Sequence, residues 1–224
     1  MSNTDAKERL LRSLKREIRD ARVLDAIRAV PRELFVPQES AAQAYDDVAL
    51  SIGEGQTISQ PLMVAIMLAA LDVQPSDVVL DVGTGSGYQA ALLSHLGGRV
   101  VGVERIPALA ERARAALAEG GFANVEVRAA GLVIGAPDQA PFDRIVVGAA
   151  APSVPASLVE QLRLGGRLVV PVGTPFEQRL AQVTRTLSGR DVRWLGACRF
   201  VPLIGDEGWP ADLAGLPPDE PAGV

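Results

Sequence analysis

Hydrophobic residues follow a helical spacing at the start of this chain. They recur every four residues at Leu10, Leu14 and Ile18, as on the apolar face of a helix. A second helix is expected to end before Pro31, because the residue preceding a proline avoids helical backbone angles. The first 30 residues are therefore expected to be helical. The run 62–68 is apolar nearly all round, which predicts a buried helix.

Farther along, short apolar runs alternate with helical segments. Valine-rich runs are typical of buried parallel strands, and they lie at 78–82, 99–104, 125–129, 144–147 and 167–172. Helices are expected between them, near 107–118 and 155–164. Two last runs, 180–187 and 192–200, flank the turn sequence Ser188-Gly189-Arg190-Asp191 and predict a strand pair.

This order predicts an α/β fold: a doubly wound, Rossmann-like sheet with N-terminal helices and a C-terminal antiparallel hairpin. The 224 residues suffice for one domain with a substantial core. We expect this domain over residues 1–210, with an N-terminal helical cap over about 1–60. Residues 211–224 contain Pro217, Pro218 and Pro221 and are expected to form a flexible tail.

Composition narrows the function classes. The net charge of −5 argues against non-specific nucleic-acid binding, because such binding needs a basic face. No run of 18 apolar residues and no secretory segment is apparent, so we expect a cytoplasmic protein with no membrane partner. Cys198 cannot form a disulfide within the chain and is expected to fill core space. The single histidine, His95, is expected on a helix surface, which disfavours histidine-dependent catalysis and histidine-cysteine metal sites.

A glycine-rich loop follows the first valine-rich run. Its sequence is Asp81-Val82-Gly83-Thr84-Gly85-Ser86-Gly87, and Glu104 ends the next run 21 residues after Gly83. In a βαβ nucleotide site the glycines let the backbone approach the ligand, and the acid accepts hydrogen bonds from two ribose hydroxyls. The dinucleotide fingerprint G-x-G-x-x-G is not met, because its third glycine is replaced by Tyr88. A nicotinamide-linked oxidoreductase is therefore disfavoured.

The pattern D-x-G-x-G-x-G resembles the first motif of S-adenosylmethionine-dependent methyltransferases. An acid two residues before the first glycine, here Asp81, can contact the amino-acid end of a ligand that lacks a pyrophosphate. A glycine loop alone is equally compatible with an ordinary strand-to-helix turn. The interpretation therefore depends on Asp81 and Glu104 as well as on the glycines.

Longer stretches resemble the protein-L-isoaspartate O-methyltransferase family over roughly residues 30–210. The most specific is Gly55-Gln56-Thr57-Ile58-Ser59-Gln60-Pro61. Further matches are Glu33-Leu34-Phe35-Val36-Pro37, Ala44-Tyr45-x-Asp47, the glycine loop with Tyr88-Gln89-Ala90-Ala91, Val103-Glu104-Arg105, Ala149-Ala150-Ala151-Pro152, Gly165-Gly166-Arg167-Leu168-Val169-x-Pro171-Val172-Gly173 and Arg199-Phe200-Val201-Pro202-Leu203.

The resemblance implies a class I methyltransferase fold and a repair reaction on damaged proteins or peptides. S-Adenosyl-L-methionine would methylate the free carboxylate of an L-isoaspartyl residue, leaving S-adenosyl-L-homocysteine. The ester then closes to a succinimide, which reopens in part to aspartate. That carboxylate is already ionised at pH 7, so the enzyme needs no general base and has mainly to align the reactants.

The resemblance also implies the site residues. Ser59 is the active-site serine, whose hydroxyl could orient the acceptor carboxylate. Its alternative role is to cap a helix that begins at Pro61. Cofactor contacts are expected from Thr57, Ile58, Asp81, Gly83, Thr84, Gly85, Gly87, Glu104, Ala130 and Gly131.

The chain departs from the family at Ala130. Relatives usually have Gly-Asp-Gly where this chain has Ala129-Ala130-Gly131, and their aspartate accepts a hydrogen bond from the adenine amino group. Asp138 is too far along the loop to be assumed a substitute. Two alternatives stay open: a methyltransferase of the same fold directed at another peptide carboxylate, and a non-enzymatic module that binds isoaspartyl or succinimide groups. The sequence does not indicate an oligomeric state.

Overall fold

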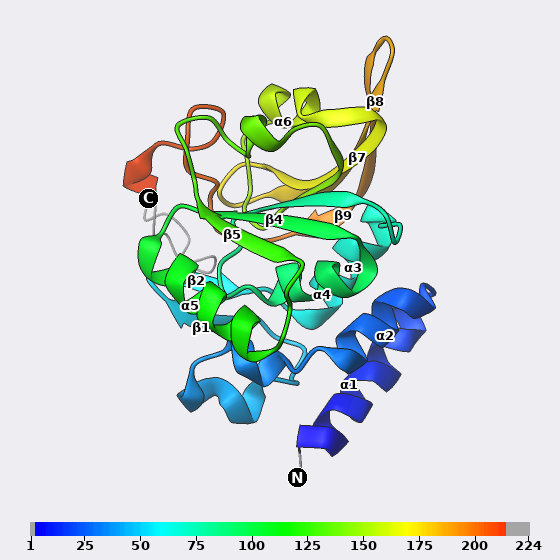
Figure 1. The fold of residues 1–224 in the computed structure, drawn as a ribbon, viewed down its shortest axis with the longest axis vertical. Coiled ribbons are helices and arrows are strands. Elements are labelled where there is room, and N and C mark those ends of the chain that lie inside the picture. Colours follow the sequence, from blue (N-terminus) through cyan, green and yellow to red (C-terminus); the bar gives the residue numbers. More distant parts are fainter. Residues whose placement is uncertain (1–2, 214–224) are drawn as a thin grey trace.

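Seven strands form the central sheet of the computed structural model, which describes residues 3–213 (Figure 1). Their order across the sheet is β5-β4-β3-β6-β7-β8-β9. The first five of these are parallel to one another, and β8 is antiparallel to both of its neighbours. The strands are β3 (Val78–Val82), β4 (Arg99–Glu104), β5 (Val125–Ala129), β6 (Phe142–Val147), β7 (Leu162–Gly173), β8 (Gln178–Thr186) and β9 (Gly189–Cys198).

Helices cover the two faces of the sheet unequally. One face packs against α1 (Asn3–Glu17), α2 (Ala21–Ala29), α3 (Pro61–Leu71), α4 (Tyr88–Leu96) and α5 (Pro107–Glu119). The other carries α6 (Ala156–Glu160) and the connection between β5 and β6. Short 3₁₀ segments are η1 (Arg32–Phe35), η2 (Gln38–Gln43), η3 (Pro137–Gln139) and η4 (Ala211–Leu213). Within residues 3–213, no helix is both long enough and apolar enough to cross a membrane.

The expected α/β sheet, N-terminal helices and C-terminal hairpin are confirmed. The helix expected over 155–164 is wrong in its second half, because Leu162 already pairs with Phe142 in the sheet. Residues 50–58 form a two-stranded hairpin that the spacing of apolar residues does not predict, with strands β1 (Leu50–Gly53) and β2 (Gln56–Ile58). Of the expected tail, 211–213 form a 3₁₀ turn and 214–224 lie outside the described residues.

Cys198 and His95 lie where the sequence predicts. Cys198 ends β9 and packs half-buried against the core, where burial raises the pKa of its thiol to about 11. The thiol is therefore protonated at neutral pH and unsuited to be a nucleophile. His95 is exposed in the last turn of α4. Among residues 3–213, no cluster of potential metal ligands occurs.

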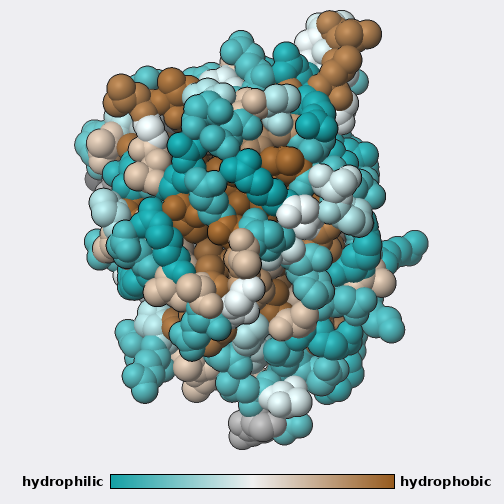
Figure 2. Space-filling view, viewed as in Figure 1, coloured by the Kyte–Doolittle hydropathy of each residue, from teal (hydrophilic) through white to brown (hydrophobic). Residues whose placement is uncertain are grey.

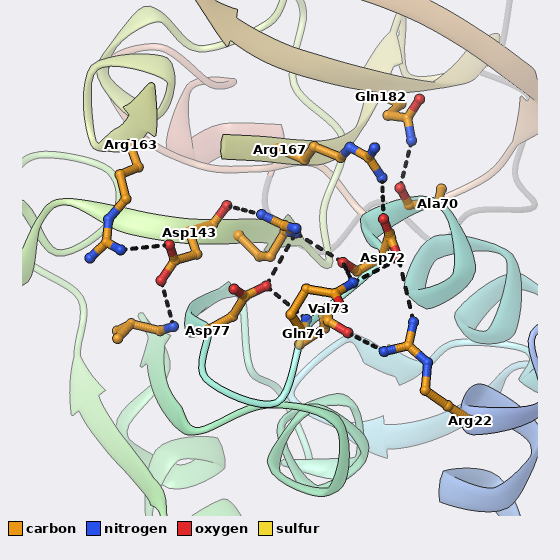
Figure 3. A network of polar contacts seen from close by, with 12 residues as sticks. Arg22, Ala70, Asp72, Val73, Gln74, Asp77, Asp143, Arg163, Arg167 and Gln182 are labelled. Carbon is orange, nitrogen blue, oxygen red and sulfur yellow. Dashed lines mark hydrogen bonds and ion pairs between the residues drawn. The ribbon is translucent and has the colours of Figure 1, made fainter. Parts of the chain in front are cut away.

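A polar network ties the layers together at the amino-terminal edge of the sheet (Figure 3). Asp72 follows α3 in the left-handed conformation, with φ of 54°. Its carboxylate accepts hydrogen bonds from Arg22 of α2 at 3.3 Å and Arg167 of β7 at 3.0 Å. Its carbonyl oxygen accepts a hydrogen bond from Arg144 of β6 at 3.1 Å. One residue thus joins the N-terminal helices to two strands.

We predict that two substitutions of Asp72 distinguish the contribution of its charge to stability from that of its left-handed backbone conformation. Asp72→Asn keeps a residue that tolerates positive φ and should lower the free energy of unfolding by less than about 1 kcal/mol, since the carboxylate is partly exposed. Asp72→Ala adds a left-handed alanine and should cost roughly 1–2 kcal/mol more. Urea denaturation measures both. Equal stability of the two variants would contradict the conformational part of this prediction.

Candidate active site

The glycine loop lies at the carboxyl edge of the sheet, between β3 and α4. Gly83, Gly85 and Gly87 have φ of 77°, 56° and 92°, a region that side chains other than glycine rarely adopt. A Cβ at Gly87 would also lie 3.3 Å from the Cβ of Ala113 on α5. The three glycines that predict a ligand-binding loop are therefore also needed for the backbone conformation of the loop, and Gly87 for its packing against α5.

Glu104 holds this loop from the end of β4. Its side chain is buried, and its two carboxylate oxygens accept hydrogen bonds from the backbone N–H groups of Gly85 and Ile106, each at 2.8 Å. A carboxylate oxygen can accept more than one hydrogen bond, so each retains capacity for a ligand hydroxyl. The acid is thus fixed in place at the position where a ribose acceptor is expected.

The order of the strands reverses between β3 and β6, and the carboxyl ends of these two strands lie in contact. A Cβ at Gly148, directly after β6, would lie 2.9 Å from the carbonyl oxygen of Gly83. The N–H of Gly148 donates to the carbonyl of Val82 at 2.8 Å. In open α/β sheets, ligands bind outside the carboxyl ends of the strands where the strand order reverses. This junction is such a point.

A cleft of about 940 Å³ opens beside this junction. Its lining includes Ile52, Gln56 and Thr57 of the β1–β2 hairpin, the glycine loop and Glu104. A mainly aliphatic or glycine part of the lining, called here the apolar end of the cleft, consists of Ile106, Leu109, Ala130, Gly131, Leu132, Val133, Ile134, Leu203, Ile204 and Gly205. The cleft therefore combines polar and glycine-rich lining with an apolar end, as suits a nucleoside ligand.

A second cleft of about 1050 Å³ adjoins the first. Both are lined by Thr57, Gly148 and Val201. The second is also lined by Ala49, Ser59, Gln60, Met63, Ala197, Cys198, Arg199 and Phe200. A smaller hollow lined by Thr57, Ser59, Gly83, Gly85 and Gly148, among others, lies between them. Ser59 therefore faces the place where contents of the two clefts would meet.

Asp81 lies beneath the glycine loop rather than on the wall of either large cleft. Its side chain is fully buried, with Oδ1 accepting a hydrogen bond from Gln89 at 2.9 Å. Its Oδ2 has no hydrogen-bond partner among the described residues. Burial is the main reason that its pKa is raised to about 7, and the charge of Glu104 adds to this. A direct contact of Asp81 with a ligand stays a prediction.

Most of the expected site residues gather around the two clefts. Thr57, Gly83, Gly85, Glu104, Ala130 and Gly131 line the first cleft, and Ile58 and Thr84 line the small hollow beside Ser59. Thr84 is buried, and its hydroxyl donates to the carbonyl of Asp81 at 3.2 Å. Gly87 precedes α4 and lines none of these three cavities. Gly87 therefore has a structural role in the loop, and its contact with a cofactor stays a prediction.

The helix-cap alternative for Ser59 is wrong. The N-cap position of α3 is Gln60, and no side chain of the cap residue bonds the helix. Asp47, which is distant in the sequence, caps the helix instead: its Oδ1 accepts a hydrogen bond from the N–H of Leu62 at 2.8 Å. Its Oδ2 accepts a hydrogen bond from the Gln60 side chain at 3.1 Å. The hydroxyl of Ser59 is thus not engaged in capping α3.

Asp138 does not substitute for an acid at Ala130. Its carboxylate accepts two hydrogen bonds from Arg128, at 2.8 and 3.1 Å, and it does not line the first cleft. This agrees with the expectation that it lies too far along the loop.

Some residues of the site were not expected from the sequence to have a role there. Gln89 reaches Asp81, Ile106 lines the apolar end of the first cleft, and Arg199 is the charged residue lining the second. Gln89 and Arg199 occur within matched motifs, yet the motifs do not say where these side chains lie. Their positions depend on contacts between segments far apart in the chain.

We predict that Asp81 makes the protein less stable as pH rises from about 4 to 7. Its folded pKa lies above the unfolded value near 3.9, so the folded state binds more protons in this range. Each pKa unit corresponds to about 1.4 kcal/mol. Asp81→Asn should remove this component while its amide oxygen still accepts from Gln89. Urea unfolding from pH 4.5 to 7.5 tests this, and identical pH profiles for both proteins would contradict it.

Comparison with known families and proteins agrees with this geometry. The family model described as protein-L-isoaspartate(D-aspartate) O-methyltransferase matches residues 5–208. Protein-L-isoaspartate O-methyltransferase 1 of Rhodopseudomonas palustris is 53% identical over 213 residues, covering 93% of this chain and 86% of the relative. The Geobacter metallireducens protein-L-isoaspartate O-methyltransferase is 49% identical over 197 residues, covering 88% and 91%.

Solved structures extend the agreement to the fold. A protein-L-isoaspartate O-methyltransferase superposes with a TM-score of 0.82 at 26% identity, covering 90% of this chain and 67% of that one. A Plasmodium falciparum protein assigned to the same activity, in complex with S-adenosyl-L-homocysteine, gives 0.72 at 26% identity, covering 85% and 94%. The family match over almost all of the described residues, and relatives near half identity over most of their length, place the chain: it belongs to the protein-L-isoaspartate(D-aspartate) O-methyltransferase family.

Proposed function

We propose that this enzyme transfers the methyl group of S-adenosyl-L-methionine to the free carboxylate of L-isoaspartyl residues in damaged proteins and peptides. The observation that carries the proposal is the meeting of two clefts at Thr57 and Gly148, with Ser59 at the junction. One cleft has the lining of a nucleoside site. The other is an open cleft lined by Ser59 and Arg199, which suits a peptide carboxylate.

The first cleft fits the methyl donor. Glu104 would accept the ribose hydroxyls, since its two oxygens are held by Gly85 and Ile106 and keep free acceptor capacity. The aliphatic end near Ala130 would enclose the adenine. The unpartnered Oδ2 of Asp81 lies under the glycine loop and would favour a cationic amino group nearby. When bound, S-adenosyl-L-methionine supplies a methyl group already activated by its sulfonium.

The second cleft fits an anionic acceptor. Ser59 offers a hydroxyl donor beside the junction, and Arg199 brings a positive charge to the same cleft. An isoaspartyl carboxylate is ionised at pH 7 and needs no proton removed before it reacts. The role of Ser59 is to orient one carboxylate oxygen, which is a task of alignment rather than of acid-base chemistry. The exposed His95 on α4 has no part in it.

The expected partners form part of the same proposal. Substrates of the family are isoaspartyl proteins, and a net charge of −5 makes nucleic acid an unsuitable acceptor. A cytoplasmic location also stays a proposal, which accords with a single, free cysteine.

Methyl transfer from labelled S-adenosyl-L-methionine to matched peptides tests the function directly. One peptide carries isoaspartate and the other its aspartyl isomer. We expect base-labile methyl ester in the first peptide only. Equal methylation of both would favour the alternative of a retargeted carboxylate methyltransferase. Binding of the isoaspartyl peptide without transfer would favour the non-enzymatic module.

We predict that Ser59→Ala lowers kcat more than it weakens cofactor binding. A hydroxyl that orients the charged acceptor is worth about 1.5–3 kcal/mol, or roughly 10- to 150-fold in rate. The dissociation constant of S-adenosyl-L-homocysteine should stay within about threefold. Ser51→Ala is the matched control, because Ser51 lies in the adjoining hairpin, paired with Thr57, and lines none of the three cavities. Unchanged turnover of Ser59→Ala would refute its assigned role.

We predict that Ala130→Asp tightens binding of S-adenosyl-L-methionine by roughly 0.5–1.5 kcal/mol. A new carboxylate at the apolar end would accept from the adenine amino group, and its desolvation offsets part of the gain. Ala129→Asp is the control, since Ala129 is a neighbouring exposed residue that does not line the cleft. Calorimetry measures both affinities. Weaker binding by a folded Ala130→Asp variant would mean that other groups already hold the adenine.

A further inference from the structure

A buried arginine connects the N-terminal region to the active site. Arg32 lies in η1, yet its side chain is fully buried. Its Nη2 donates to the backbone carbonyl of Ser59 at 2.9 Å, and its guanidinium carbon lies 4.8 Å from the centre of the Tyr88 ring. Tyr88 begins α4 directly after the glycine loop. One side chain therefore contacts both the serine segment and the helix that follows the loop.

This arginine is held in an energetically costly way. Its Nε and Nη1 have no hydrogen-bond partner among the described residues. Burial lowers the pKa of Arg32, and its interaction with Tyr88 and the charge of Asp47 oppose that effect only in part. Removing a cation from water without a paired carboxylate is unfavourable. A leucine or methionine would fill the space more cheaply, so stability alone does not account for an arginine here.

The segment that Arg32 holds has few other supports. Ser59 and Gln60 separate β2 from α3, and Pro61 has no N–H to donate. Asp47 fixes the far side of this segment through Leu62 and Gln60. Arg32 fixes the near side through the Ser59 carbonyl. With that peptide plane held, the backbone that carries the Ser59 hydroxyl cannot rotate freely within the junction of the clefts.

We propose that Arg32 is a positioning residue of the methyl transfer, which sets the Ser59 segment against the start of α4 so that acceptor and methyl donor meet in register. This inference rests on the proposed function. It requires Arg32 to act through Ser59, because Arg32 lines neither large cleft. Displacement of a reacting group by about 1 Å can cost on the order of 100-fold in rate.

A double-mutant cycle tests the inference. Arg32→Met and Arg32→Lys are each made alone and with Ser59→Ala. With isoaspartyl peptide and saturating S-adenosyl-L-methionine, Arg32→Met should lower kcat roughly 10- to 100-fold, while the dissociation constant of S-adenosyl-L-homocysteine changes less than about threefold. Arg32→Lys keeps one donor that can reach the carbonyl or the ring but not both, and it should recover part of kcat. In the Ser59→Ala background, neither change should lower kcat further, since coupled residues are not additive.

Arg144→Met is the matched control. Arg144 is also a largely buried arginine that bonds a backbone carbonyl, but it bonds Asp72 and pairs with Asp77 at the other edge of the sheet. Its loss should lower thermal stability and leave kcat within about twofold. This control separates a general loss of stability from a loss of position.

The outcomes are distinct. A wild-type protein that methylates no isoaspartyl peptide overturns the proposed function and this inference with it. An active wild type, with kcat of Arg32→Met within twofold of it, overturns the inference alone. The inference alone is also overturned if the loss of kcat in the double variant equals the product of the losses in the two single variants, because Arg32 would then act independently of Ser59. If Arg32→Met does not fold and Arg32→Lys does, the cycle is measured with Arg32→Lys and Ser59→Ala. A kcat of Arg32→Lys within twofold of wild type then overturns the inference.

Discussion

The contact between the ends of β3 and β6 is the constraint on which the rest of this structure depends. A Cβ at Gly148 would lie 2.9 Å from the carbonyl oxygen of Gly83, so there is no room for a side chain at Gly148. Strand order reverses here, with β4 and β5 on one side and β6 to β9 on the other. The loops after these strands diverge from this point and leave the first cleft open. A larger residue at Gly148 would push the two halves of the sheet apart at the site itself.

Around that opening, the N-terminal region acts as part of the active site rather than as a separate cap. The β1–β2 hairpin supplies Thr57 to both large clefts, and Asp47 replaces the missing helix cap of α3. Arg32 reaches the same segment from η1. The helices α1 and α2 are in turn fastened to the opposite edge of the sheet through Arg22 and Asp72 (Figure 3). The serine segment itself is held by Arg32 on one side and by Asp47 on the other.

Surface features away from the site are few and local. The turn joining β8 and β9 extends beyond the body of the molecule and carries the almost fully exposed Leu187 (Figures 1 and 2). Arg179 lies over the ring of Trp194 on the neighbouring strand at 5.1 Å, which shields part of that indole from water. Nothing in this hairpin contacts the clefts directly until Ala197, where β9 turns toward the junction.

The sequence by itself determined the order of elements, the glycine loop with Glu104, and the family. These depend on local spacing: valine runs predict buried strands, and φ near 56° to 92° at alternate positions demands glycine. Tertiary structure alone decided that Ser59 is not a helix cap, that Asp81 is buried beneath the loop, and that Arg32 and Gln89 bond Ser59 and Asp81 respectively. It also turned 162–164 from helix to strand through pairing with β6. Burial and long-range hydrogen bonds join residues many positions apart, so no local pattern can encode them.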